Sequence, residues 1–282
     1  MLITAILTTF NCKRYVKDSL NSIFKQTFPP FEVVVVDDHS TDGTFEILQT
    51  LKKEFNFLLI RNRENLERCQ TRNRGVEAAK GDFVCFLDCD DLWDNTYLEK
   101  INKILTKNID AVYGPPKGFI NNTGEITKVK KPLKGPNLKR LLFSGRVGYP
   151  SGSCFKKETF LRLEGYKERY LMREDWEIFL RFFLKGEKVE FLPQGDYFIR
   201  EHADRSSKSK KFLKASLRVY KDYLPYLEKE EKVLISLHIA AQCLRFGFPK
   251  CGRRIFLKTL LEYPKAITFF REMWEILKRL VR

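Results

Sequence analysis

The stretch Phe83–Trp93, FVCFLDCDDLW, begins as an apolar run and ends in three carboxylates. The run Phe83–Leu87 is typical of a strand that is buried on both faces. Asp88, Asp90 and Asp91 follow it, and such a cluster repels itself unless something positive lies within it. A divalent cation bound through oxygen, with a phosphate as its other partner, would satisfy these acids. The alternative is a polar turn in which an Asp caps the next helix.

A second apolar run, Phe31–Val36, also ends in acids, Asp37 and Asp38. Strand-like and helical segments alternate over residues 2–113, which is typical of βαβ units and a parallel sheet. Ligands of such sheets bind outside the carboxyl ends of the strands. We therefore expect the two acidic clusters to converge on one site.

The remainder of the chain changes character in two steps. Residues 115–206 contain a loop or hairpin rich in Gly and Pro, short strands and an amphipathic helix, and basic helices follow. We predict an α/β domain over 1–206, with halves 1–114 and 115–206, and a basic helical extension over 207–282. In its last helix, one apolar face is expected to hold Ala266, Ile267, Phe270, Met273, Trp274, Leu277, Leu280 and Val281.

The net charge of +16 is concentrated in the C-terminal part. Residues 205–282 carry 19 Lys and Arg against 7 Asp and Glu. This excess would attract an anionic partner, such as a membrane surface, a nucleic acid or a phosphorylated substrate. No zinc, RRM or helix-turn-helix pattern accompanies it, so we predict no nucleic-acid partner.

The N-terminus and the cysteines predict the compartment. Strand-like sequence follows Met1 directly, without the pattern of a secretory signal, and no apolar run is long enough to cross a membrane. The seven cysteines are scattered and form no C-x-x-C pair. We therefore predict a cytoplasmic protein whose cysteines are reduced.

Several segments, in this order along the chain, resemble family 2 glycosyltransferases of the GT-A fold, whose sheet is Rossmann-like and mostly parallel. The segments are Ile6–Asn11, Ser22–Thr27, Glu32–Thr44, Arg72–Gly75 and Leu87–Asp91. Arg173–Trp176 with Arg181, and Arg200–His202, extend the resemblance to about residue 206. His39 and Cys89 depart from the residues usual at their positions, and neither position needs its side chain for the chemistry.

The resemblance implies transfer of a sugar from a nucleoside-diphosphate sugar, with a UDP-sugar favoured, to a glycan or lipid-linked hydroxyl with inversion. A Mn²⁺ or Mg²⁺ ion would stabilise the leaving nucleoside diphosphate. The resemblance assigns this ion to Asp90, with Asp91 close by. His202 would ligate the ion or touch the diphosphate.

The resemblance also implies the contacts to the donor and the catalytic base. The nucleotide-sugar residues would be Thr8, Phe10, Asp37, Asp38, Arg68, Arg72, Asp88 and Cys89, with Arg74 as a rival to the other two arginines. The general base would be Asp175 or its neighbour Glu174, which would take the proton of the acceptor hydroxyl. The alternative for both acids is that they only cap their helix.

Two other functions compete with glycosyl transfer. One is a D-x-D phosphotransferase or phosphatase, which Leu92 after Asp91 disfavours. The other is a non-catalytic protein that binds anionic surfaces.

The sequence leaves three roles open for the basic extension: it packs on the catalytic domain, forms an oligomer or touches a membrane peripherally at its inner face. The sugar, the acceptor and the linkage do not follow from the sequence.

Overall fold

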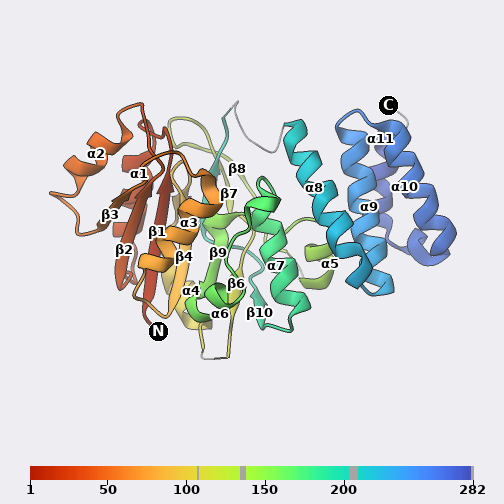
Figure 1. Ribbon diagram of the computed structural model, residues 1–282, viewed down its shortest axis with the longest axis horizontal. Coiled ribbons are helices and arrows are strands. Elements are labelled where there is room, and N and C mark those ends of the chain that lie inside the picture. The colour runs from red at the N-terminus through yellow and green to blue at the C-terminus, as the bar shows by residue number, and fades with distance from the viewer. Residues whose placement is uncertain (107, 134–137, 203–208, 281–282) are drawn as a thin grey trace. The chain divides into compact units, whose positions relative to one another are not determined.

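The computed structural model describes residues 1–106, 108–133, 138–202 and 209–280 (Figure 1). The chain forms two compact units. The first comprises residues 1–136, 149–169 and 181–203, and the second comprises 137–148, 170–180 and 204–282. The predicted domain boundary at residue 206 lies outside the described residues, so it stays a prediction.

The first unit is built on a seven-stranded sheet in the order β10-β6-β9-β4-β1-β2-β3. Its central strands are parallel, and β9 runs antiparallel to both of its neighbours. The mostly parallel sheet predicted from the alternating pattern is thus confirmed. The strands are β1 (Ile3–Thr9), β2 (Glu32–Asp37), β3 (Leu58–Arg61), β4 (Phe83–Asp88), β6 (Ala111–Tyr113), β9 (Ser153–Lys156) and β10 (Val189–Phe191).

A smaller, four-stranded sheet has the order β5-β11-β7-β8. Its strands are β5 (Leu92–Trp93), β7 (Gly118–Ile120), β8 (Ile126–Val129) and β11 (Tyr197–Arg200). The loop after β4 leads directly into β5, and β5 pairs with β11. The residues that follow β11 are therefore brought beside the acidic loop after β4.

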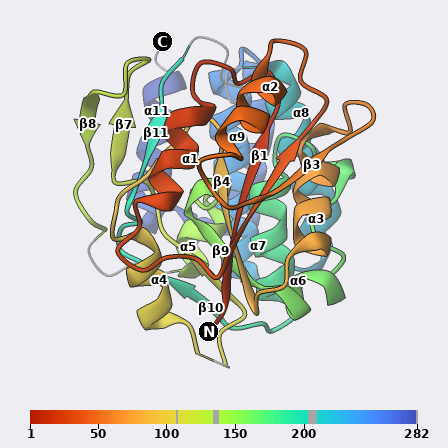
Figure 2. The same ribbon diagram turned by 90° about the vertical axis from the view of Figure 1, so that its left-hand side faces the viewer.

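Successive side chains of a strand point to opposite faces of the sheet, so the apolar strands of the large sheet need cover on both faces. Helices provide that cover on both faces (Figure 2). On one face, Ala5 and Leu7 share a core cluster with Leu20 of α1. On the other face, α3 contacts β1 and β2. The helices of this unit are α1 (Val16–Phe24), α2 (Thr44–Leu51), α3 (Glu67–Ala78), α4 (Tyr97–Ile104), α6 (Lys157–Arg162) and the end of α7 (Glu174–Leu184).

Gly75 lets α3 lie close to the sheet. A Cβ atom at this position would come within 2.7 Å of Cγ2 of Ile6 and 3.4 Å of Cγ2 of Val36. Two atoms cannot approach as closely as the first of these distances without a shift of one partner. The separation between α3 and β1 therefore depends on the missing side chain at residue 75.

The second unit is helical apart from its loops in the described residues. Its helices are α5 (Leu138–Phe143), the start of α7, α8 (Lys210–Tyr223), α9 (Lys229–Arg245), α10 (Pro249–Glu262) and α11 (Phe270–Leu280). Both α10 and α11 pack on α9 (Figure 1). Their shared core contains Leu237, Phe256, Met273 and Ile276. No helix in the described parts of the chain is both long and apolar enough to cross a membrane.

The predicted apolar face of the last helix is wrong in two respects. The sequence predicts this helix from residue 265, but a 3₁₀ segment, η5 (Pro264–Thr268), precedes α11. The apolar residues also do not form one continuous covered face, because packing on α9 buries only a narrow stripe that includes Met273 and Ile276. Four other members of the predicted face are exposed: Ile267, Phe270, Trp274 and Leu277.

Candidate active site

The ends of three neighbouring strands bring the predicted acids to one edge of the sheet. In the strand register, Thr8 of β1 lies opposite Asp88 of β4, and Thr9 lies opposite Asp37 of β2. Neighbouring strands are about 5 Å apart. Thr8, Asp37 and the acidic loop after β4 therefore converge, as the sequence predicts.

Asp88 is paired with an arginine of the helix behind it. Arg72 of α3 donates from an Nη atom to Oδ1 of Asp88 at 2.7 Å, and the arginine side chain is almost fully buried. A guanidinium held in this way has a fixed position, because its planar fork matches a carboxylate. Of the three rival arginines, Arg72 is thus the one that reaches the end of β4.

The other two arginines differ from Arg72. Arg74 donates to Oδ1 of Asn62 and so supports the segment after β3. Arg68, one turn before Arg72 on α3, is half-buried. The contact of Arg68 with the donor stays a prediction.

Asp91 is buried and both of its carboxylate oxygens accept hydrogen bonds. The hydroxyl of Ser151 donates to Oδ2 at 2.6 Å, and the backbone N–H of Arg200 donates to Oδ1 at 3.1 Å. Burial, together with the charges of Asp90 and Asp88, raises the pKa of Asp91 well above its ordinary value. Asp91 therefore joins the acidic loop to β11 and to the segment around Ser151.

Asp90 lies between these anchored acids and remains partly exposed. Its Oδ2 is 2.9 Å from Nε2 of His202, which follows β11. The buried guanidinium of Arg200 donates from Nε to the backbone oxygen of Asp90 at 2.9 Å and from an Nη atom to the backbone oxygen of Asn121 at 2.8 Å. These bonds fix the backbone from which the Asp90 side chain extends.

The carboxylate of Asp90 is the type of donor that Mn²⁺ and Mg²⁺ prefer, and the nitrogen of His202 lies close enough to reach the same ion. In the described residues, no group of three or more His, Cys, Asp or Glu side chains forms a complete metal cage. A cation held by Asp90 and His202 would therefore complete its coordination with phosphate oxygens and water. The residues fit such an ion, and the geometry favours Asp90 over the enclosed Asp91.

Asp37 and Asp38 are both buried and shape the loops that follow β2 and β3. Oδ2 of Asp37 accepts from the backbone N–H of Ser40 at 3.1 Å, and burial raises the pKa of Asp37. Oδ1 of Asp38 accepts from Nδ2 of Asn62 at 2.7 Å and from the backbone N–H of Leu66 at 2.8 Å. Their predicted contacts with base and ribose stay predictions.

The remaining donor candidates flank this edge. Thr8 is buried in the register position opposite Asp88, and Phe10, just beyond the end of β1, is exposed. Cys89 lies between Asp88 and Asp90 in the acidic loop. An exposed aromatic ring at a ligand-binding edge offers a stacking surface for a flat base.

The prediction that the cysteines are reduced is wrong for one pair. Cys12, in the loop after β1, and Cys89 form a disulfide, with their Cα atoms 6.3 Å apart. The hydroxyl of Ser19 in α1 also lies 2.8 Å from the backbone oxygens of both Cys89 and Asp91, which share its single proton. The acidic loop is therefore tied to the start of the chain by one covalent bond and by the Ser19 hydroxyl.

Asp175 and Glu174, the predicted general bases, belong to the second unit. Glu174 is buried, whereas Asp175 is half-buried at the start of α7. Gly148, in a left-handed conformation (φ +128°), faces the Asp175 carboxyl so closely that a Cβ there would lie 3.0 Å from Cγ of Asp175. The partial exposure of Asp175 favours it over Glu174, and the role itself stays a prediction.

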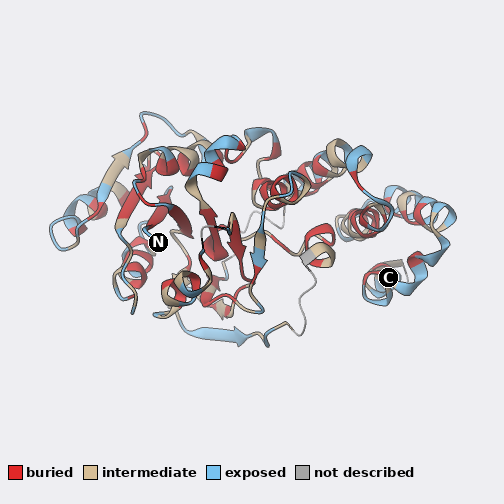
Figure 3. Cartoon of the chain, turned by 90° about the horizontal axis from the view of Figure 1, so that it is seen from below, coloured by how far each residue is buried: buried red, intermediate tan, exposed pale blue. Residues whose placement is uncertain are grey.

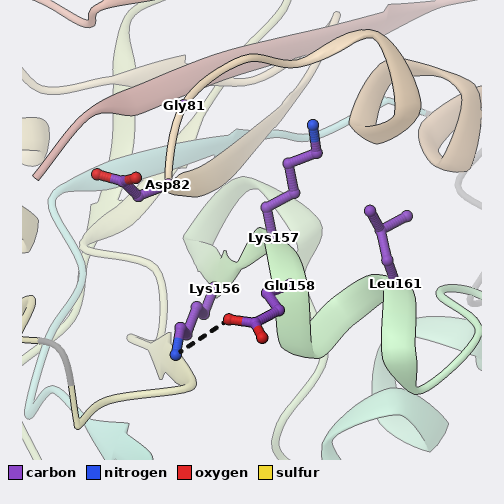
Figure 4. Close-up of a pocket in the computed structure, with 6 residues that line it drawn as sticks. All are labelled: Gly81, Asp82, Lys156, Lys157, Glu158 and Leu161. Atoms are coloured by element: carbon purple, nitrogen blue, oxygen red, sulfur yellow. Dashed lines mark ion pairs between the residues drawn. The ribbon is translucent and has the colours of Figure 1, made fainter.

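A pocket of about 290 Å³ lies elsewhere on the first unit (Figure 4). Gly81 and Asp82 line it just before β4, together with Lys156, Lys157, Glu158 and Leu161. Lys156 and Glu158 form an ion pair there at 3.6 Å. Because β4 runs from this pocket toward Asp88, the pocket lies at the opposite end of the strand from the acidic loop.

The sequence matches the model of glycosyl transferase family 2 over residues 4–164, which is more than half of the chain. The chain belongs to glycosyltransferase family 2. The family predicted from the order of the motifs is thereby confirmed.

Two relatives show what this family 2 member is similar to. It is 30% identical over 184 residues to an uncharacterized glycosyltransferase of Haemophilus influenzae, a match that covers 64% of this chain and 61% of the relative. The chain thus spans less than two thirds of that relative. It is 27% identical over 213 residues to the UDP-Glc:alpha-D-GlcNAc-diphosphoundecaprenol beta-1,3-glucosyltransferase WfaP of Escherichia coli, covering 74% of this chain and 81% of WfaP.

A solved structure confirms the fold of this family 2 member. The mannosyltransferase PcManGT from Pyrobaculum calidifontis, in complex with GDP-Man and Mn²⁺, superposes with a TM-score of 0.63 at 20% identity. The similarity covers 99% of this chain and 86% of PcManGT. The predicted GT-A fold is therefore confirmed.

Sequence reasoning missed three supporting residues of this family 2 site. Ser151 holds Asp91, Asn62 holds Asp38, and Cys12 holds Cys89. Each lies far along the chain from its partner, so no local pattern reveals the pair. The only available signal was the polar character of Ser151 and Asn62 beside strand-like sequence.

Proposed function

We propose that this family 2 member is an inverting, metal-assisted glycosyltransferase. Its donor is a nucleoside-diphosphate sugar, with a UDP-sugar favoured, and its acceptor is a hydroxyl of a glycan or of a lipid-linked sugar. The observation that carries the proposal is the Asp90–His202 pair, beside the Asp88–Arg72 pair, at the carboxyl ends of β1 and β4. The names of WfaP, with UDP-Glc and a diphosphoundecaprenol acceptor, and of PcManGT, with GDP-Man and Mn²⁺, support it.

Asp90 and His202 are the residues that would hold the cation. When bound, the cation supplies positive charge that stabilises the leaving nucleoside diphosphate. Arg200 and Ser151 keep the acidic loop in place through their hydrogen bonds to Asp90 and Asp91. Arg72 offers a fixed guanidinium that can donate to a phosphate or to the base.

The transfer itself needs a base on the acceptor side. In the proposed reaction, Asp175 accepts the proton of the acceptor hydroxyl while its oxygen bonds to the anomeric carbon. The bond between that carbon and the phosphate oxygen breaks in the same displacement, and the electron pair leaves with the nucleoside diphosphate. A single displacement inverts the anomeric centre.

We further propose that the protein acts in the cytoplasm, at the inner face of the cell membrane, although a disulfide such as Cys12–Cys89 is uncommon in that compartment. A lipid-linked acceptor, as named for WfaP, is embedded in a bilayer, so an enzyme that uses one gains from peripheral contact with that surface. The basic helical extension is the part of the chain whose charge suits this contact.

The test is calorimetry with UDP-, GDP- and dTDP-sugars, with and without Mn²⁺ or Mg²⁺. We expect one donor class to bind only with the cation, and Asp90→Asn to weaken that binding at least about tenfold, because a neutral amide is a poorer ligand for a hard cation. Asp82→Asn is the matched control, because Asp82 is an exposed carboxylate at the opposite end of β4. The control should bind the donor like the unmodified protein.

Two results would contradict the proposal. One is that no sugar nucleotide binds in a metal-dependent way. The other is metal-dependent release of inorganic phosphate from a phosphomonoester, which would favour the phosphotransferase alternative.

A further inference from the structure

The helix α11 carries a second apolar stripe that stays largely exposed. Its buried stripe, with Met273 and Ile276, packs on α9. Phe270, Trp274 and Leu277 form another stripe at helical spacing, and Phe270 is 76% exposed and Trp274 61% exposed. Large apolar side chains at this exposure leave much hydrophobic surface in water.

Exposed apolar side chains also occur on the segments that precede α11. Leu257 and Leu261 of α10 lie one helical turn apart, and both are exposed. Ile267 of η5 is exposed as well. We call the six side chains together the tail surface: Leu257, Leu261, Ile267, Phe270, Trp274 and Leu277. Exposed residues are also frequent near the C-terminus in Figure 3.

Basic side chains accompany the tail surface, and the acids among them are neutralised. The exposed basic residues of α10, η5 and α11 are Lys250, Arg253, Arg254, Lys258, Lys265, Arg271 and Lys278. Glu262 pairs with Lys258, and Glu275 pairs with Lys278 and Arg279. Glu272, the other acid of these segments, is buried against Arg140 and Arg146.

We infer that the tail surface docks on an anionic lipid bilayer. Helices that lie in a membrane interface combine Trp, Phe and Leu with Lys and Arg, and they place the apolar side chains below the headgroups. Each basic residue near the surface adds attraction to anionic lipids. The docking is a property of α10, η5 and α11; it rests on the proposed peripheral membrane contact and names the side chains that make it, and it does not depend on the proposed transfer reaction.

A second copy of the chain fits the tail surface less well than a bilayer. Two copies that met through it would bring basic residues of like sign together, which costs energy at close range. Lysine is also depleted at protein–protein interfaces. Anionic headgroups have the complementary charge.

The chain contains its own reporter for this docking. Trp93 and Trp176 are buried, at 3% and 0% exposure, whereas Trp274 lies within the tail surface. Vesicles should therefore change the fluorescence of Trp274 alone. The readout requires neither donor nor acceptor, so it can fail or succeed independently of the transferase proposal.

The experiment compares vesicles of phosphatidylcholine alone with vesicles that also contain phosphatidylglycerol. We expect the anionic vesicles to carry the protein in flotation and to shift its tryptophan emission to the blue, and added salt to weaken both effects. The variant Phe270→Ser/Trp274→Ser/Leu277→Ser should lose flotation by about tenfold or more. Because these side chains are exposed, the variant should keep its thermal unfolding midpoint.

Two control variants accompany the test of bilayer docking, and three results would contradict it. Phe31→Ser removes an exposed phenylalanine of the first unit, and Trp274→Phe removes the reporter; both should float normally. Equal binding to neutral and anionic vesicles, or normal flotation of the triple variant, would overturn the inference. A dimer in which Trp274 is shielded without vesicles would overturn it in favour of a second copy.

Discussion

Individual side chains in the acidic loop have separate tasks, although the sequence presents them as one cluster. Asp88 is paired with Arg72, Asp91 is enclosed by Ser151 and Arg200, and Asp90 meets His202. The sequence alone could predict that three acids at a strand end form a site. It could not assign the tasks, because these depend on partners outside the acidic loop, which lie 16 residues away for Asp88 and Arg72, 60 for Asp91 and Ser151, and 112 for Asp90 and His202.

Ser151 is expected to control how firmly the acidic loop is held. The change Ser151→Ala would leave Oδ2 of the buried Asp91 without its donor, at a cost of about 1–3 kcal/mol in the free energy of unfolding. We expect metal-dependent donor binding to weaken as well. Chemical denaturation and calorimetry check the two effects.

Ser153→Ala is the matched control for Ser151→Ala. Ser153 is also buried, but its hydroxyl donates to the backbone oxygen of Tyr149, outside the acidic loop. The control should lose stability and keep its affinity for the donor. Unchanged donor affinity in both variants would mean that Ser151 has no influence on the site.

Gly148 is expected to set the position of the Asp175 carboxyl. In Gly148→Ala, the new methyl group would come within about 3 Å of that carboxyl and displace it. The rate of transfer should fall about 100-fold, because a shift of the base by about 1 Å is costly, while donor affinity is retained. Initial rates with calorimetry in parallel would show this division.

Gly186→Ala is the control for Gly148→Ala, because it introduces the same backbone strain without a methyl contact to the Asp175 carboxyl. Gly186 also has a positive φ (+77°), but a Cβ there would meet no atom within 4 Å. This variant should lose about 1 kcal/mol of stability and keep its transfer rate. If both variants lose transfer equally, strain rather than contact with Asp175 is the cause.

Among the secondary-structure elements, those with strong periodicity were predictable and those shaped by distant partners were not. The sequence predicts a strand over Ala111–Tyr113 and an amphipathic helix over Glu174–Leu184, and β6 and α7 have these bounds in the structure. The antiparallel direction of β9 and the exposed stripe of α11 escaped prediction. A strand's direction and the width of a helix's buried stripe depend on neighbours that the pattern of one segment does not contain.

The Cys12–Cys89 bond is expected to stabilise the first unit as a link between the loop after β1 and the loop after β4. It spans 77 residues, and closing a loop of that length in the unfolded chain is worth about 4 kcal/mol. Reduction with a dithiol should lower the denaturant midpoint by a corresponding amount. Cys12→Ser should show that lower midpoint in both conditions. A midpoint that reduction leaves unchanged would show that the bond does not contribute to stability in solution.

At the scale of the whole molecule, the residues predicted to contact the donor belong to the first compact unit, and the predicted base, Asp175, belongs to the second. The general charge distribution was predictable, because it follows directly from residue counts. The division into units was not, since residues 137–148 and 170–180 belong to the helical unit although they lie within the predicted catalytic domain.

Asp175→Asn should therefore separate donor binding from transfer. The amide cannot accept the acceptor proton, so the rate should fall by about two to four orders of magnitude. Calorimetry should show an unchanged affinity for the metal and the sugar nucleotide. Glu174→Gln, at the buried neighbour, should retain much more of the transfer activity. Loss of donor binding in Asp175→Asn would remove its assignment as the base.

The small separation between α3 and β1 at Gly75 has a consequence for the reach of Arg72. Arg72 lies almost one helical turn before Gly75 on the same helix, so any side chain at residue 75 that displaces α3 also moves the start of the Arg72 side chain. An arginine has a fixed length, and a small outward shift would open its bond to Asp88. The absence of a side chain at residue 75 thus sets how close α3 lies to β1. Through Arg72, this separation determines whether the bond to Asp88 at the end of β4 can form.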